Sequence, residues 1–137
     1  AMMLKDKNEI NKILSEKNNS DITKKLVSLT DLYGDESILK DLNTLLPDQV
    51  VANNVTKSLT SICENLKEMN VEISFDFSDI RGYQYHTGIV YSAYAQKFNT
   101  AVAQGGRYDN MNKFAGDMRP ATGFSIDLRF IINNLLN

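Results

Sequence analysis

The sequence has a single cysteine, Cys63, and a single histidine, His86, among its 137 residues. One cysteine cannot form a disulfide within the chain, and protein zinc sites draw most of their ligands from several cysteines and histidines. We therefore expect no disulfide framework and no metal site. We also expect no cofactor. A lone cysteine is typical of proteins of the reducing cytosol, so we expect a cytoplasmic location.

The sequence also lacks a strong charge of either sign and any long apolar run. A net charge of −2 and a pI near 5.4 provide no overall field that would attract nucleic acid. Charges interrupt the stretch from Leu4 to Ile13, unlike a signal peptide, and no apolar run approaches membrane-spanning length. We therefore expect neither a nucleic-acid nor a membrane partner. An apolar fraction of 42% suffices for the core of one domain, or of one domain with an appendage.

Apolar residues recur at helical spacing through the first half of the chain and predict three short helices followed by a long one. The apolar stripes are Ile10, Ile13 and Leu14; Ile22, Leu26, Leu29, Leu32 and Tyr33; Ile38, Leu42, Leu45 and Leu46; and Val55, Leu59, Ile62, Leu66 and Met69. Ser20 and Asp21 are suited to cap the second helix, Gly34 to stop it, and Pro47 to end the third. The long helix is predicted to run from about residue 51 to residue 69.

At residue 71 the apolar period changes from helical to two. Alternation over 71–77 predicts a half-buried strand, and strands are also predicted over 87–95, 100–104 and 120–126. A turn at 96–99 would join the second strand to the third. Asp127 is suited to cap a final helix. The layout is α+β, with a helical part at 1–50 and a mostly antiparallel sheet with flanking helices at 51–137.

Residues 81–88, with the sequence RGYQYHTG, form the first candidate site. The arginine can bind a carboxylate or phosphate through two hydrogen bonds, and the aromatic rings can wall a planar ligand. On pattern alone, a tyrosine-rich strand end that packs into the core explains the segment equally well.

Two further glycine-containing clusters follow, at residues 104–109 (QGGRYD) and 119–129 (RPATGFSIDLR). Paired glycines after a strand let a ligand or another backbone come close, although spacing alone favours a β-bulge or turn at Gly105 and Gly106. The third cluster, taken alone, reads best as a buried strand leading into a capped helix.

In order and spacing, the three clusters together resemble signatures of the histidyl-tRNA synthetase family. The first resembles its histidine motif RGLDYYTG, the second its motif GGRYD, and the third resembles class II motif 3, ATGFA followed by GLER. The resemblance covers residues 71–132 and implies a class II synthetase-like fold. Motifs 1 and 2 have no counterpart, so we expect a C-terminal fragment of that core.

The resemblance implies a histidine-binding pocket. Arg81 takes the place of the arginine that neutralises the substrate carboxylate or the adenylate phosphate, and Tyr108 takes that of a tyrosine lining the side-chain pocket. Gly105 and Gly106 would form the floor beside it. Tyr85 and His86 fall where the family has paired tyrosines, so one ring of the pocket is altered.

The third cluster departs from motif 3 where synthetases bind ATP. Aligned without a gap, Asp127 replaces a glycine and Phe130 replaces the arginine that stacks on adenine. Arg129 comes one residue early, a rotation of about 100° on a helix, and cannot stand in. A carboxylate at 127 also repels a triphosphate. We therefore expect adenylate formation to be lost, with no catalytic residues.

Retention of the amino-acid pocket without the ATP stack, together with the pattern YxYHTG, resembles the regulatory subunit of ATP phosphoribosyltransferase. This resemblance implies a non-catalytic protein of histidine biosynthesis. It would assemble with the short catalytic subunit, in a hetero-octamer when full length, activate it and take part in feedback control by L-histidine. The alternatives are a fragment of a divergent histidyl-tRNA synthetase and a degenerate domain used for assembly only.

Overall fold

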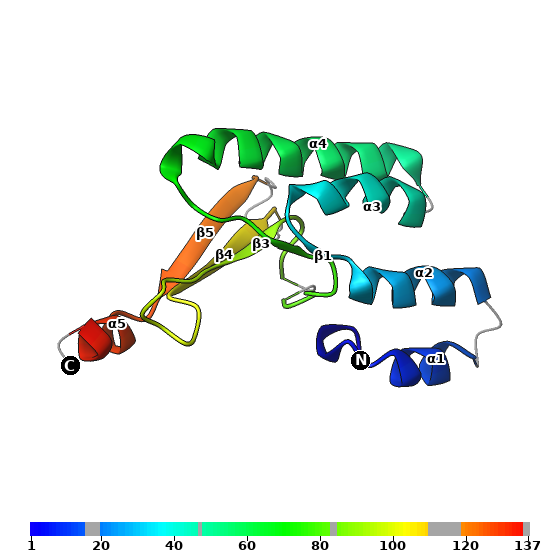
Figure 1. Ribbon diagram of the computed structural model, residues 1–137, viewed down its shortest axis with the longest axis horizontal. Coiled ribbons are helices and arrows are strands. Elements are labelled where there is room, and N and C mark those ends of the chain that lie inside the picture. The colour runs from blue at the N-terminus through cyan, green and yellow to red at the C-terminus, as the bar shows by residue number, and fades with distance from the viewer. Residues whose placement is uncertain (16–19, 47, 83–84, 110–118, 136–137) are drawn as a thin grey trace. The chain divides into compact units, whose positions relative to one another are not determined.

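The fold is α+β, as predicted. The computed structural model in Figure 1 describes residues 1–15, 20–46, 48–82, 85–109 and 119–135. Contacts divide the chain into two compact units, Ala1–Ile80 and Arg81–Asn137, and each is considered by itself. The predicted boundary at residue 50, which concerns where the synthetase-like core begins, stays a prediction. Within the described segments, no helix has the length and apolar character to cross a membrane.

The first unit opens with a helical hairpin. A 3-10 turn, η1 (Met2–Leu4), precedes α1 (Lys7–Ser15), which packs against α2 (Ser20–Asp31). The predicted helices over these stretches are confirmed. Lys7 Nζ lies 2.6 Å from the Asp31 carboxylate, so an exposed ion pair joins the start of α1 to the end of α2.

A second helix pair follows, with α3 and α4 side by side (Figure 1). The 3-10 helix η2 (Glu36–Ile38) leads into α3 (Leu39–Leu45), and α4 (Gln49–Leu66) ends in the 3-10 helix η3 (Lys67–Met69). The predicted third and fourth helices are thus confirmed. Asp48 caps α4, because its Oδ1 accepts hydrogen bonds from the backbone N–H groups of Val50 at 2.8 Å and Val51 at 3.1 Å.

The core of the first unit comes only in part from the predicted apolar stripes. Its buried apolar residues are Ile10, Leu32, Leu39, Leu42, Ala52, Leu59 and Cys63. Ile10, Leu32, Leu42 and Leu59 belong to those stripes, whereas Leu39, Ala52 and Cys63 do not. Burial raises the pKa of the Cys63 thiol.

The predicted strand at 71–77 is largely wrong. Regular pairing is confined to β2 (Phe75–Asp76), which runs antiparallel to β1 (Tyr33–Gly34). The alternation survives in burial, since Ile73, Phe75 and Phe77 are half-buried while their neighbours at 72, 74 and 76 are exposed. The ladder is short because β1 stops where Asp35 turns the chain into η2, with its carboxylate accepting from Ser37 N–H at 2.9 Å.

The second unit is a three-stranded antiparallel sheet in the order β3–β4–β5. Its strands are β3 (Val90–Ala93), β4 (Ala103–Tyr108) and β5 (Ala121–Ile126). The expectation of a bulge or turn at Gly105 and Gly106 is wrong. Both residues lie inside β4, in register with β3 on one side and β5 on the other.

Two strand boundaries in this sheet differ from the prediction. The strand predicted at 87–95 is regular over four residues, and the one predicted at 100–104 runs on to residue 108. The connection between them is also wider than 96–99. Phe98 within that connection packs on Phe130, with ring centroids 5.6 Å apart, and local sequence cannot show such a long-range contact.

The bounds of the last strand and the last helix match their predictions, but the expectation of a buried strand is wrong, because β5 lies at the edge of the sheet and is largely exposed. After β5, Asp127 caps α5 (Leu128–Leu135), because its Oδ1 accepts the N–H of Phe130 at 2.9 Å. The Asp127 carbonyl also accepts the N–H of Ile131 at 3.1 Å, the first hydrogen bond of the helix.

The cap of α4 gives a direct test of this architecture. Replacing Asp48→Ala leaves two helical N–H groups without their acceptor and should lower the free energy of unfolding by about 1 kcal/mol. Asp48→Asn keeps a side-chain oxygen in place and should cost less. Urea unfolding followed by circular dichroism measures both; equal losses in the two variants would contradict the capping role.

Candidate functional site

One face of the β3–β5 sheet carries the candidate site. Side chains alternate between the two faces of a strand, so Gly106 and Tyr108 of β4 share a face. The register places Gly123 of β5 directly opposite Gly106. Ser92 of β3 pairs with Gln104, two residues before Gly106, and so lies on the same face.

The His86 imidazole is held between two glycines. A Cβ atom on Gly106 would lie 2.7 Å from His86 Nδ1, and one on Gly82 would lie 2.8 Å from His86 Cδ2. Both distances are shorter than real side chains tolerate, so the ring fits because neither residue has a side chain. Gly82 also has φ of +63°, a left-handed conformation that favours glycine. Within the described part of the chain, buried Nδ1 has no hydrogen-bond partner.

Three aromatic rings, those of Tyr85, His86 and Tyr108, form a ring cluster beside these glycines. The Tyr85 ring centroid lies 5.1 Å from that of His86, in an edge-to-face arrangement, and 5.1 Å from that of Tyr108. The His86 and Tyr108 centroids are 6.5 Å apart. The Tyr108 hydroxyl reaches over Gly123, where an added Cβ would lie 2.7 Å from it. Such rings provide flat apolar walls with polar edges, suited to a small planar ligand.

Arg81 is anchored on the same face of the sheet. Its Nη2 donates a hydrogen bond to Ser92 Oγ at 2.8 Å. A guanidinium has five N–H donors in a planar fork, a geometry that suits a carboxylate. The structure thus brings Arg81 to the face that carries the ring cluster.

Five of the six residues predicted for the pocket therefore share one face, and Gly105 does not. Its Cβ position points to the opposite face, toward the Tyr91 ring at 2.7 Å and the Gly123 carbonyl. Gly82, Ser92 and Gly123 were not predicted as site residues from the sequence. Gly82 and Gly123 lie inside the motifs already singled out, whereas Ser92 carries no local signal.

The start of α5 is committed to contacts within the chain. The Asp127 carboxylate is engaged as the cap of the helix, and the half-buried Phe130 ring packs on Phe98. Arg129, between them, is exposed. Where the resembling motif carries a small residue and an adenine-stacking arginine, this chain therefore has a carboxylate and a packed phenyl ring.

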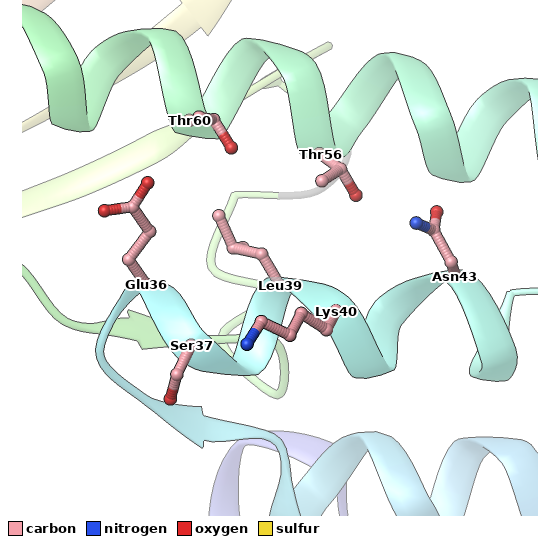
Figure 2. Close-up of a pocket in the computed structure, with 7 residues that line it drawn as sticks. All are labelled: Glu36, Ser37, Leu39, Lys40, Asn43, Thr56 and Thr60. Atoms are coloured by element: carbon pink, nitrogen blue, oxygen red, sulfur yellow. The ribbon is translucent and has the colours of Figure 1, made fainter.

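A groove of about 440 Å³ lies between α3 and α4 in the first unit and contains none of the predicted site residues. Figure 2 shows Thr56 and Thr60 pointing from α4 toward α3, with Asn43 pointing back toward α4. Its remaining lining residues are Glu36, Ser37, Leu39 and Lys40. The groove has no aromatic wall, so the ring cluster is the better candidate for recognising a planar ligand.

Residues 1–131 match the family model described as histidyl-tRNA synthetase. The chain belongs to the histidyl-tRNA synthetase family. That assignment covers the three motifs and the helical part at 1–50 alike.

Relatives within this family are named as ATP phosphoribosyltransferase regulatory subunits. The chain is 41% identical over 117 residues to such a protein from Methylobacillus flagellatus, matching 85% of this chain and 30% of the relative. It is 43% identical over 104 residues to those from Neisseria meningitidis and Nitrosomonas eutropha, matching 76% of this chain and 27% of each relative. The matched region is thus less than a third of these relatives' length.

A solved structure shares the fold. It is that of an ATP phosphoribosyltransferase regulatory subunit/histidyl-tRNA synthetase from Bacillus halodurans, with a TM-score of 0.80 at 21% identity. The match covers 98% of this chain and 36% of that one. The fold is therefore histidyl-tRNA synthetase-like. Among the described residues, no cluster of three or more histidine, cysteine, aspartate or glutamate residues is placed to hold a metal ion.

The glycine pair beneath the rings gives a matched test of the site. Gly106→Ala would put a Cβ against the His86 ring and 3.0 Å from the Ile89 carbonyl, so it should lower the free energy of unfolding by about 1–3 kcal/mol. Gly123→Ala meets the hydroxyl end of Tyr108 and should cost less than about 1 kcal/mol.

Tyrosine fluorescence during urea unfolding can measure both variants, because five of the six tyrosines lie in Arg81–Asn137. Equal costs for the two alanines, or a larger cost at Gly123, would contradict the packing of His86 against Gly106.

Proposed function

We propose that this chain is part of a non-catalytic regulatory subunit of ATP phosphoribosyltransferase that binds L-histidine. The observation that carries the proposal is the contrast between the two ends of the sheet unit. The ring cluster offers a face for a small planar ligand, and Tyr85 within it is 53% exposed. The start of α5, in contrast, is closed by a capping carboxylate and a packed phenyl ring.

Histidine suits the ring-cluster face on chemical grounds. An imidazole is planar and apolar on its faces, so it can stack among Tyr85, His86 and Tyr108. A carboxylate is a natural partner for the Arg81 guanidinium on the same face. Gly106 and Gly123 have no side chains, so the His86 and Tyr108 rings can lie directly against the sheet backbone. The resemblance to the family's histidine motifs supports the same ligand.

ATP chemistry is disfavoured at α5. The Asp127 carboxylate would lie close to a bound triphosphate and repel it. Phe130 takes the position of the adenine-stacking arginine. Its ring packs against that of Phe98, with the two ring centroids 5.6 Å apart. Arg129 projects about 100° away on the helix. We infer that adenylate formation is lost and that the chain has no synthetase activity.

The names of the relatives supply the wider role in this proposal. The protein would work in the cytoplasm, in the first step of histidine biosynthesis. It would assemble with the short catalytic ATP phosphoribosyltransferase, as a hetero-octamer in its full-length form. It would activate that enzyme and convey inhibition by histidine. Such coupling requires histidine to bind the active and inhibited assemblies with different affinities.

One alternative is a fragment of a divergent histidyl-tRNA synthetase, which the family assignment favours. Another is a degenerate domain used for assembly only. The three roles differ in their ligands. The regulatory role requires histidine without ATP, the synthetase role requires both, and assembly requires neither.

Calorimetric titration distinguishes the three roles. We expect the chain to bind L-histidine and not ATP, with an affinity for histidine that changes when the short catalytic phosphoribosyltransferase is added. Tyr108→Ala should weaken histidine binding by about tenfold or more, since it removes one ring of the cluster. Tyr94→Ala removes a ring that is 68% exposed and should leave the affinity unchanged.

Two results would overturn the proposal. ATP binding with histidine-dependent adenylate formation would support the synthetase role. Silence with both ligands, in the presence of the catalytic subunit as well, would leave assembly as the function.

A further inference from the structure

The segment that carries His86 is attached to β4 beyond the regular end of β3. The N–H of Thr87 donates to the Arg107 carbonyl at 2.9 Å, and the N–H of Arg107 donates to the Ile89 carbonyl at 2.9 Å. The Arg107–Ile89 bond keeps the register of β3 with β4, whereas the Thr87–Arg107 bond is two residues out of it, so residues 87–88 are held to β4 outside the regular ladder that begins at Val90. Residues 87–89 are thus tied to the end of the central strand.

Side-chain contacts reinforce this attachment. Thr87 Oγ1 accepts the N–H of Asp109 at 2.9 Å. The Asp109 carboxylate accepts from Arg107 Nε, with both oxygens at 3.0–3.1 Å. The Arg107 stem lies against Gly88, where an added Cβ would be 3.1 Å from Arg107 Cδ. Hydrogen bonding from Arg107, with a further contribution from Thr87, lowers the pKa of the Asp109 carboxyl and keeps it ionised at neutral pH.

His86 immediately precedes Thr87, where these contacts begin. On its other side, its own N–H donates to the Gly82 carbonyl at 2.8 Å. The backbone of His86 is therefore fixed from both directions, which determines how its imidazole enters the gap between Gly82 and Gly106. A small shift of residue 87 would move the ring against glycines that leave it no slack.

We propose that Thr87, Arg107 and Asp109 form a latch that positions the His86 imidazole, and through it the ring cluster. The inference deepens the proposed function, because a positioned ring cluster is what histidine would bind. These three are positioning residues and do not themselves line the ligand face; Arg107, next to Gly106 and Tyr108 in β4, lies on the opposite face by strand alternation.

A purely structural role for the latch makes a different prediction. Exposed ion pairs such as Arg107–Asp109 contribute little to stability, so a structural role would show as a small loss of stability with His86 undisturbed. A positioning role would move the imidazole with little change in stability. The environment of His86 is therefore the deciding observable.

His86 is the sole histidine of the chain, so its imidazole resonances are unambiguous in an NMR spectrum. Thr87→Val removes the hydroxyl that accepts from Asp109 and should shift or broaden the His86 ring signals. Thr87→Ser keeps that hydroxyl and should restore them. Thr122→Val, at the exposed β5 position paired with Arg107, provides a matched control and should leave them unchanged.

Histidine titration of the same variants links the latch to the ligand. Thr87→Val should weaken L-histidine binding about threefold to tenfold, the range that one hydrogen bond supplies, while Thr87→Ser and Thr122→Val should not. Asp109→Asn provides a second route if Thr87→Val fails to fold, because it removes the charge that pairs with Arg107. Circular dichroism confirms folding in each case.

The outcomes separate the latch from the proposed function. Unchanged His86 signals in folded Thr87→Val or Asp109→Asn would overturn the latch, whether or not histidine binds. Displaced His86 signals in a chain that binds no histidine would support the latch and reject the histidine-binding function. Displaced signals with unchanged histidine affinity would overturn the claim that the latch shapes the ligand site.

Discussion

Continuous backbone pairing on both sides of β4 is the constraint on which the candidate site depends. A strand paired on both edges has its register fixed twice, once by β3 and once by β5. That register puts Gly106 opposite Gly123 and sends Gly105 to the other face. It also brings the ends of the three sequence motifs together, since each motif contributes to, or abuts, one strand of this sheet. A one-residue slip would exchange the two faces and separate His86 from its glycine.

Apolar burial is distributed unequally between the two units. The buried apolar residues all lie in Ala1–Ile80, whereas Gly106 is the one buried residue among those described in Arg81–Asn137. Phe124 and Leu128 remain 68% and 65% exposed. Among the described residues, the sheet unit is therefore held by backbone pairing, glycine contacts and capping more than by buried apolar side chains. Its geometry should consequently respond to small polar contacts and to ligands more than a well-packed core would.

Helices were predictable because the signals that specify them are local. The period of apolar residues located α1 to α4, and Asp127 revealed the cap of α5 from its position alone. Strands depend on a partner elsewhere in the chain. Alternation at 71–77 predicted the half-buried side chains at 73, 75 and 77 but not the exposed Val71, and pairing stopped at two residues because Asp35 ends β1. The local preference of glycine for turns likewise gave way at Gly105 and Gly106 to pairing with two neighbouring strands.

The sequence predicted which motifs contribute residues to the candidate site, but not how those residues are arranged in space. Resemblance singled out Arg81, His86 and Tyr108, and the sheet register explains why residues so distant in sequence share a face. No sequence rule shows that the His86 imidazole fills the space left by Gly82 and Gly106, because that fit requires two backbone segments to be placed to within a few tenths of an ångström. The family motif has a tyrosine where this chain has His86, and an imidazole is the shorter of the two rings. The shorter ring fits between Gly82 and Gly106, where a phenol would also have to place its hydroxyl, so the depth of the candidate site depends on the residue at this position.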